Sequence, residues 1–139
     1  MTRRHTTRFT VEFGDCDPAR IVHYPNFLWW MDAASRHFFV AAGVASWTEL
    51  EATTGIVGTP VVDVAIRFVR PATYGEEIEI ETWIEEWRGK SFVMKHLIRR
   101  GDDIVAEGQE TRVFARRHPE DSARIQAIAL PEAIRRQFA

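Results

Sequence analysis

The sequence predicts a domain of the α+β class, in which an antiparallel sheet of five to six strands wraps around one long helix. Hydrophobic residues recur at every second position over much of the chain after Gly58, as they do in half-buried strands. One segment, from Pro25 to Gly43, has helical spacing and is apolar on almost all sides, which is typical of a helix covered by other structure. The order of one strand, one helix and then several strands fits a sheet that curls around that helix.

Length and composition favour one globular domain over residues 1–139, since 45% of the residues are hydrophobic and 27% are charged. A net charge of -2 gives no overall attraction to nucleic acid or to anionic lipid, so neither is expected as a partner. Cys16 is the only cysteine, which favours a reducing compartment. With no signal-peptide pattern and no long uncharged apolar run, we expect a cytoplasmic protein that does not cross a membrane.

The first half of the chain predicts one strand and two helices. Alternation of Phe9, Val11 and Phe13 with polar residues indicates a strand over 6–13. Pro25 suits the first turn of the long helix, and Gly43 suits its end. Its inner stripe is expected to hold Phe27, Trp30, Met31, Ala34 and Phe38. Ser46 and Glu49 form a capping-box pattern for a short helix over 47–52.

The second half predicts five strands and a short terminal helix. In the segment VVDVAIRFVR one face would carry Val62, Val64, Ile66 and Phe68, and in EEIEIETWIEEW one face would carry Ile78, Ile80, Thr82 and Ile84. The segments SFVMKHLIRR and DIVAEGQETRVFARR indicate two more strands, and a last strand is expected over 125–128. A helix should follow from Pro131.

Several kinds of active site are disfavoured by the sequence. The G-x-S-x-G nucleophile elbow, the phosphate-binding G-x-x-x-x-G-K-[ST] loop and the G-x-G-x-x-G motif do not occur. The five histidines are scattered without ligand spacing, so we expect neither a metal site nor a cofactor. Asp15 and Asp17 flank Cys16 and oppose formation of its thiolate, so this cysteine is expected to serve packing.

Carboxylates remain as the candidate reactive groups. Asp15 or Asp17 could cap a turn, since aspartate before proline is a common loop signal, or could act in catalysis. A helix that starts near Tyr24 offers unpaired N–H groups and the positive end of its dipole to an oxyanion on a substrate carbonyl. A carboxylate beside this point can attack the carbonyl or activate water, and this suffices when the leaving group is a thiolate. These features favour a thioester as substrate.

Asp32 stands out because it lies in the middle of the otherwise apolar helix. It could point into solvent or pair with Arg36, four residues further along the helix. Alternatively, it could lie in a pocket and bind a specific group. The sequence pattern leaves these possibilities open.

Three segments carry a resemblance to a known family: EFGDCDPARIVHYPNFLWWMDAASRHFF, GIVGTP and EWRGKSFV. Together they resemble the hot-dog-fold acyl-CoA thioesterases, of the loop-aspartate type that includes the 4-hydroxybenzoyl-CoA thioesterases. The resemblance extends over almost the whole chain. It implies a sheet wrapped around the central helix, active sites at a homodimer interface, and dimers that pair into a homotetramer.

The resemblance also implies roles for individual residues. Asp17 would be the catalytic carboxylate, and the N–H of Tyr24 would polarise the thioester carbonyl. The aryl pocket would be lined by Asp32, Trp47, Thr59 and His23, with Asp32 accepting a hydrogen bond from a phenol. The phosphates of coenzyme A would be bound by Arg88, Lys90 and Ser91.

Three positions depart from the motif. Arg20 stands where the motif usually has glycine, His23 stands where an aromatic residue is expected, and Gly89 interrupts a basic triplet. Another type of hot-dog thioesterase uses a glutamate on the central helix, but no glutamate occurs between Pro25 and Gly43. This absence favours the loop-aspartate type.

We therefore expect an enzyme that hydrolyses an aromatic acyl-CoA, with 4-hydroxybenzoyl-CoA as the expected substrate. An alternative is a thioesterase for short-chain aliphatic or general acyl-CoA, but an apolar acyl chain has no use for a buried Asp32 carboxylate. A second alternative is a non-catalytic module that binds acyl thioesters. In such a module, Asp17 would have no evident role.

Overall fold

The computed structural model describes residues 2–139, whose strands form one seven-stranded antiparallel sheet. The elements follow in the order β1 (Arg4–Thr10), the 3₁₀ helix η1 (Phe13–Asp15), α1 (Pro25–Ala41), α2 (Trp47–Thr54), β2 (Ile56–Gly58), β3 (Val61–Phe68), β4 (Glu77–Trp87), β5 (Ser91–Arg100), β6 (Asp103–Arg117), β7 (Ile125–Ile128) and α3 (Glu132–Arg136). The strand order is β1-β4-β5-β6-β2, and β3 and β7 also pair with β6. The long strand β6 thus organises the sheet.

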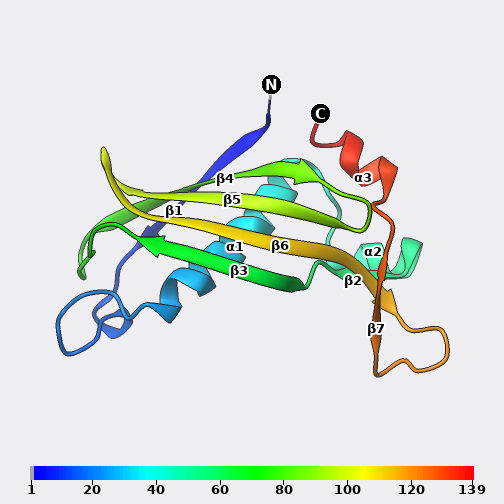
Figure 1. Ribbon diagram of the computed structural model, residues 1–139, viewed down its shortest axis with the longest axis horizontal. Coiled ribbons are helices and arrows are strands. Elements are labelled where there is room, and N and C mark those ends of the chain that lie inside the picture. The colour runs from blue at the N-terminus through cyan, green and yellow to red at the C-terminus, as the bar shows by residue number, and fades with distance from the viewer. Residues whose placement is uncertain (1) are drawn as a thin grey trace.

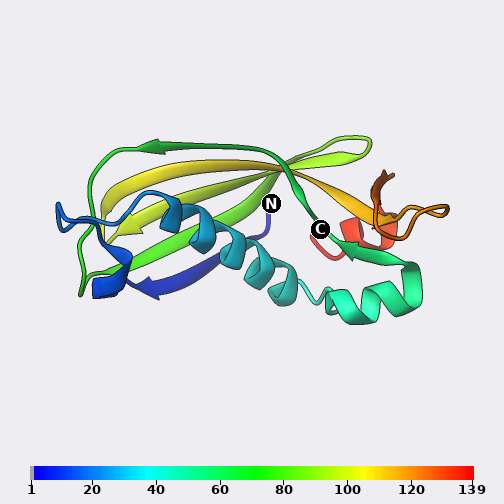
Figure 2. The ribbon, with the colours of Figure 1, turned by 90° about the horizontal axis from the view of Figure 1, so that it is seen from below.

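The sheet curves over α1, which lies along its concave side (Figures 1 and 2). This arrangement confirms the expected sheet wrapped around one long helix. The two ends of α1 lie near different parts of the molecule. Its beginning is close to the loop that follows β1, and its end lies toward α2 and α3.

The local signals for α1 and α2 act as expected. Pro25 occupies the first turn of α1, and Gly43 takes a φ of +86° just after the helix, where the left-handed conformation favours glycine. The Oγ of Ser46 accepts a hydrogen bond from the backbone N–H of Glu49 at 3.3 Å and caps α2. Helix α2 then ends at Thr54, two residues beyond the predicted 47–52 span, and Gly55 follows as its C-cap.

Two apolar clusters fill the space between α1 and the sheet. The first surrounds the N-terminal half of α1 and includes Phe27, Met31, Ile80 and Ile98. The second surrounds its C-terminal half and consists largely of aromatic rings, among them Phe38, Phe39, Phe92, Phe114 and Phe138. Gly108 on β6 allows close packing of the helix, because a Cβ at this position would lie 2.7 Å from the Sδ of Met31.

Two details of the strand prediction were wrong. Strand β1 ends at Thr10 instead of Phe13, because the Asp15 carboxylate accepts the N–H of Glu12 at 2.8 Å and closes a 3₁₀ turn. The ring of Phe13 is 78% exposed and packs on Tyr74. Strand β2 was not predicted, because three residues are too few to display a period.

The outer side of α1 differs from the expectation of a fully covered helix. Trp29 is 72% exposed and Val40 is 57% exposed in this single chain. On β3, the expected face with Val64 and Phe68 is also largely exposed, and within residues 2–139 this strand pairs with β6 alone. In the same part of the chain, no helix is long and apolar enough to span a membrane.

Candidate active site

The loop between β1 and α1 is held against the start of the helix by its own backbone. The carbonyl oxygen of Asp15 accepts hydrogen bonds from the N–H of His23 and from the side-chain amide of Asn26, both at 2.8 Å. Cys16 and Val22 form a short antiparallel bridge across the loop. Because both bonds to Asp15 come from the helix start, the residues between Asp15 and His23 are fixed beside it.

Asp15 and Asp17 take different places in this loop. Asp15 uses its carboxylate to cap the 3₁₀ turn, whereas Asp17 lines a cavity. The Oδ1 of Asp17 accepts the N–H of Ala19 at 2.8 Å, and its Oδ2 makes no hydrogen bond to any residue in 2–139. Asp17 therefore combines a turn-forming role with one carboxylate oxygen that is free to act on a ligand.

The start of α1 offers one free backbone donor. Pro25 has no N–H, while the N–H groups of Asn26 and Phe27 already donate to the carbonyls of His23 and Tyr24. The N–H of Tyr24 makes no hydrogen bond within the described chain. The helix dipole adds partial positive charge at this point, so the Tyr24 N–H is suited to polarise a carbonyl oxygen.

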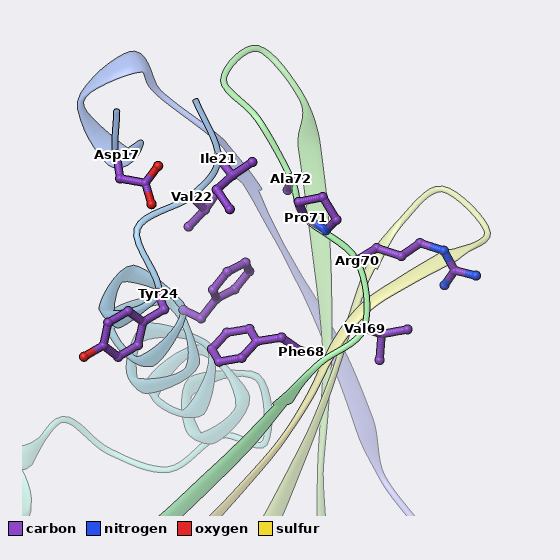
Figure 3. Close-up of a pocket in the computed structure, with 10 residues that line it drawn as sticks. Asp17, Ile21, Val22, Tyr24, Phe68, Val69, Arg70, Pro71 and Ala72 are labelled. Atoms are coloured by element: carbon purple, nitrogen blue, oxygen red, sulfur yellow. The ribbon is translucent and has the colours of Figure 1, made fainter. Parts of the chain in front are cut away.

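Asp17 and Tyr24 line the same cavity, which has a volume of about 510 Å³. Figure 3 shows Asp17 and the helix start on one side of the cavity, with Phe68 and Pro71 across from them. Most of the other lining side chains are apolar. Such a cavity suits an apolar acyl group whose carbonyl meets the few polar groups at one end.

Asp32 lies further along α1 and lines a second cavity of about 360 Å³, with Leu28, Trp29, Val61 and Val64 among its walls. Both cavities lie between α1 and β3: Phe68 at the end of β3 approaches Tyr24, and Val64 lies beside Asp32. The two cavities share no lining residue, but they follow one another along α1 and β3, and we refer to them together as the groove.

Asp32 does not pair with Arg36. Its Oδ1 instead accepts a hydrogen bond at 2.8 Å from the Nη2 of Arg112 on β6. The side chain of Arg112 is only 6% exposed, and its Nη1 donates to the carbonyl oxygen of Thr59 at 2.7 Å. Thus Arg112 brings together two of the expected pocket residues, Asp32 and Thr59.

Arg112 belongs to a buried polar network that the sequence analysis missed. Its Nη2 also donates to Glu110 at 2.8 Å, and Glu110 is hydrogen-bonded to His96 at 2.6 Å and to Ser35 at 2.8 Å. His96 is in turn 2.8 Å from the hydroxyl of Thr82. The alternation along β6 was an available signal, because it puts Glu110 and Arg112 on the same face as Phe114, which is a core residue.

The charge of Glu110 is compensated by its neighbours. Burial raises the pKa of this carboxyl, but the effect of its neighbours is larger and lowers the pKa. These neighbours are His96, through a hydrogen bond and its charge, Arg112, through its charge, and Ser35, through a hydrogen bond. The resulting pKa is about 2, below the ordinary value of 4.5. Glu110 is thus a buried anion held in place by three partners.

Trp47 and His23 have less direct relations to the groove. Trp47 is half-buried at the start of α2 and packs against Phe39, at a ring distance of 5.7 Å, in the second core cluster. His23 is exposed, and its ring lies 5.4 Å from that of Tyr24. Neither side chain lines the cavity of Asp17 or that of Asp32 in the single chain.

The expected coenzyme A residues lie at the β4–β5 hairpin. The guanidinium of Arg88 is 3.1 Å from the carboxylate of Glu86, Lys90 is exposed, and Ser91 begins β5. This hairpin lies at the opposite end of the molecule from the loop that carries Asp17 (Figure 1). One chain therefore does not bring Arg88 and Lys90 together with Asp17.

Arg20 shows how the loop accommodates its departure from the motif. It has a φ of +66°, and it is the one non-glycine residue with positive φ among residues 2–139. Its N–H donates to the carbonyl of Asp17 at 2.8 Å, and its own carbonyl accepts from Thr73 at 2.6 Å. The loop thus keeps a glycine-like backbone at Arg20, at a cost of about 1 to 2 kcal/mol. Within the same residues, no group of three or more His, Cys, Asp or Glu side chains could hold a metal ion.

Comparison with known proteins agrees with this geometry. The family model described as the thioesterase-like superfamily matches residues 11–138. The 4-hydroxybenzoyl-CoA thioesterase of Pseudomonas sp. strain CBS-3 is 45% identical over an alignment of 136 residues, and the match covers 94% of this chain and 94% of that protein. Among solved structures, a D17N mutant of 4-hydroxybenzoyl-CoA thioesterase in complex with 4-hydroxybenzoyl-CoA is 42% identical, with a TM-score of 0.92 and 99% of each chain covered.

A gentisyl-coenzyme A thioesterase is also similar, with 32% identity, a TM-score of 0.82, and coverage of 97% of this chain and 100% of that one. These matches span nearly the whole length of the chain and of its relatives. They coincide with a sheet that closes over one central helix and a loop that carries Asp17 to the start of that helix. The chain belongs to the thioesterase-like superfamily and has its hot-dog fold.

Proposed function

We propose that this protein hydrolyses the aromatic thioester 4-hydroxybenzoyl-CoA to the free acid and coenzyme A. The observation that carries the proposal is that one apolar cavity is lined both by Asp17 and by Tyr24, whose backbone N–H is free. The choice of acyl group is supported by the 45% identical relative, which is named as a 4-hydroxybenzoyl-CoA thioesterase.

The reaction begins with the thioester carbonyl oxygen accepting a hydrogen bond from Tyr24 N–H. Negative charge that develops on this oxygen is stabilised by the donor and by the dipole of α1. Asp17 then has one of two roles: it attacks the carbonyl carbon and forms an anhydride that water hydrolyses to the free acid, or it takes a proton from water that attacks the carbonyl carbon. The thiolate of coenzyme A leaves without a general acid, because its pKa is about 8 to 9.

The groove has a suitable length for a hydroxylated aromatic acyl group. Tyr24 and Asp32 are eight residues apart on the helix, which is about 12 Å along its axis. A 4-hydroxybenzoyl group with one hydrogen bond at each end spans roughly 10 to 12 Å. The free Oδ2 of Asp32 would accept the phenol hydrogen while the carbonyl contacts Tyr24.

We also propose that the active enzyme is a homodimer that assembles further into a homotetramer. The exposed apolar side chains of Trp29 and Val64 support an interface along α1 and β3. The distance between the two ends of α1, about 25 Å for 17 residues, supports a coenzyme A site that a second copy completes with Arg88 and Lys90. The lone Cys16 supports a reducing location, the cytoplasm.

The test is an initial-rate comparison of 4-hydroxybenzoyl-CoA, benzoyl-CoA and butyryl-CoA, with wild-type protein and two matched variants. Asp17→Asn should lower kcat by at least ~10²-fold with little change in the binding of an inert substrate analogue. Asp15→Asn makes the same chemical change two residues away, at a carboxylate that only caps a turn, and should stay within a few-fold of wild type. An Asp17→Asn enzyme with a third of the wild-type kcat would exclude Asp17 as the catalytic carboxylate.

The substrate panel separates the proposed function from its rivals. A wild-type preference for butyryl-CoA would indicate an aliphatic acyl-CoA thioesterase, and absence of turnover with all three esters would indicate a binding module. Single turnover in ¹⁸O-labelled water then separates the two roles of Asp17. Label in the Asp17 carboxylate requires covalent attack, whereas label only in the acid product is expected for a general base.

A further inference from the structure

Asp32 is held by an unusual contact for an exposed helical carboxylate. Its side chain is 63% exposed, so by itself it would sample several rotamers. The partner, Arg112, is almost fully buried and comes from a strand 80 residues later in the chain. A mobile surface group is therefore fixed by a rigid cation inside the core.

The guanidinium of Arg112 is itself fixed at several points. Its Nη1 donates to the carbonyl of Thr59, and its Nη2 is shared between Glu110 and Asp32, both at 2.8 Å. Glu110 is anchored by His96 and Ser35. The contacts therefore run without interruption from the centre of the sheet to the carboxylate in the groove.

The geometry of Arg112 is not the one that serves stability best. Its Nε is buried and makes no hydrogen bond to the described residues, although a bidentate pair through Nε and Nη2 is the stronger way to bind a carboxylate such as Glu110. A buried donor without a partner is costly. The guanidinium instead uses one terminal nitrogen for two carboxylates, and this brings Asp32 into the network.

We propose that Arg112 is the positioning residue for Asp32 and so determines which acyl groups the groove accepts. Arg112 binds Oδ1 of Asp32 and leaves Oδ2 without a partner, directed to an acyl ring that carries a hydrogen-bond donor such as a phenol. This inference rests on the proposed function and deepens it. Acyl groups without such a donor leave Oδ2 unpaired and are disfavoured.

The experiment measures kcat/KM for 4-hydroxybenzoyl-CoA and benzoyl-CoA in wild type, Arg112→Lys and Asp32→Asn. Lysine keeps the charge but has one nitrogen, which cannot hold Thr59, Glu110 and Asp32 in the same geometry. We expect the preference for the hydroxylated ester to fall at least ~5-fold in Arg112→Lys, with benzoyl-CoA turnover within about threefold of wild type. The double variant Asp32→Asn/Arg112→Lys should show no larger loss of preference than Asp32→Asn alone, because both changes remove the same contact.

A second variant avoids an unpaired buried charge. In Glu110→Gln/Arg112→Met both buried ions are replaced together, which such pairs often tolerate, and the same loss of preference is expected. Arg4→Gln is the control, since Arg4 lies on the far strand β1 and makes an exposed ion pair with Glu81 at 3.1 Å. The substrate preference of this variant should equal that of wild type.

Equal losses of kcat/KM on both esters in Arg112→Lys would mean that Arg112 is only structural. Additive losses of substrate preference in Asp32→Asn/Arg112→Lys would mean that Arg112 does not act through Asp32. Either result would overturn the inference. Its failure is distinguishable from failure of the proposed function. If wild type hydrolyses 4-hydroxybenzoyl-CoA preferentially and the Arg112 variants keep that preference, only the positioning role is lost. If wild type hydrolyses neither ester, the proposed function fails as well.

Discussion

Glu110 links the stability of the protein to pH, and Glu110→Gln tests this link. The folded-state pKa of about 2 lies some 2.5 units below the ordinary value of 4.5, and this difference corresponds to about 3 kcal/mol. Because the folded pKa is lowered, the contribution is fully present above pH 4.5. It is lost as the pH falls from about 4.5 through about 2, where Glu110 becomes protonated in the folded state too.

The assay is urea unfolding followed by tryptophan fluorescence, since the chain contains five tryptophans. Wild type and Glu110→Gln are compared at pH 7 and pH 3.5, at one fixed protein concentration because any oligomer makes stability depend on concentration. Other carboxyl groups titrate in both proteins, so only the difference between the two stabilities reports on Glu110. That difference should shrink by roughly 1 kcal/mol between pH 7 and pH 3.5.

The result that refutes this reasoning is a stability difference that stays constant between the two pH values. Glu110 would then have the same proton affinity in the folded and unfolded chains, in spite of its contacts with His96, Arg112 and Ser35. A difference that grows as the pH falls would also contradict it, because the sign would then be that of a raised pKa.

Two further predictions concern the coenzyme A end and the assembly. Arg88→Ala and Lys90→Ala should each raise KM for the CoA ester severalfold and leave kcat little changed. The rise in KM should be larger at low salt, because salt screens exposed cations that bind phosphate. Unchanged KM values in steady-state kinetics would point to other phosphate contacts. Trp29→Glu should shift the mass seen by light scattering toward the monomer, because it puts a charge on the exposed apolar face of α1. Ile125→Glu, at an exposed apolar residue on β7, is its control and should leave the mass unchanged; equal masses for all three proteins would contradict an interface at Trp29.

Local signals were enough to predict most of the fold. The period-two pattern of β4 put Ile78, Ile80 and Ile84 on one face, and these residues are buried as expected. Helix α1 could be predicted from Pro25 and its apolar spacing. The end of β1 could not, because it depends on a side chain that captures a backbone N–H in the following turn, and hydrophobic alternation contains no information on that bond.

The candidate site was predictable only where its parts are close in sequence. Asp17 and Tyr24 are seven residues apart, so a loop followed by a helix start was enough to bring them into one cavity. The partner of Asp32 was different, because Arg36 is the neighbour that helix geometry offers, whereas Arg112 approaches through sheet packing. Contacts of this range depend on strand register, which a single sequence specifies only weakly.

The two aspartates of the groove have environments that suit different tasks. One oxygen of Asp32 is bound by a guanidinium, which holds the carboxylate in place and leaves its other oxygen to accept a hydrogen bond from a ligand. Asp17 forms no salt bridge with any residue in 2–139 and accepts only one backbone N–H, so its other oxygen keeps its lone pairs for the reaction. Tyr24, which carries the free helix N–H, also lines the cavity of Asp17 and not that of Asp32. In the mechanism that we propose, the carboxylate fixed by a cation serves recognition, and the carboxylate without a cation, beside the free helix N–H, serves chemistry. This proposed division of roles between Asp32 and Asp17 follows from their neighbours, since the two side chains are chemically identical.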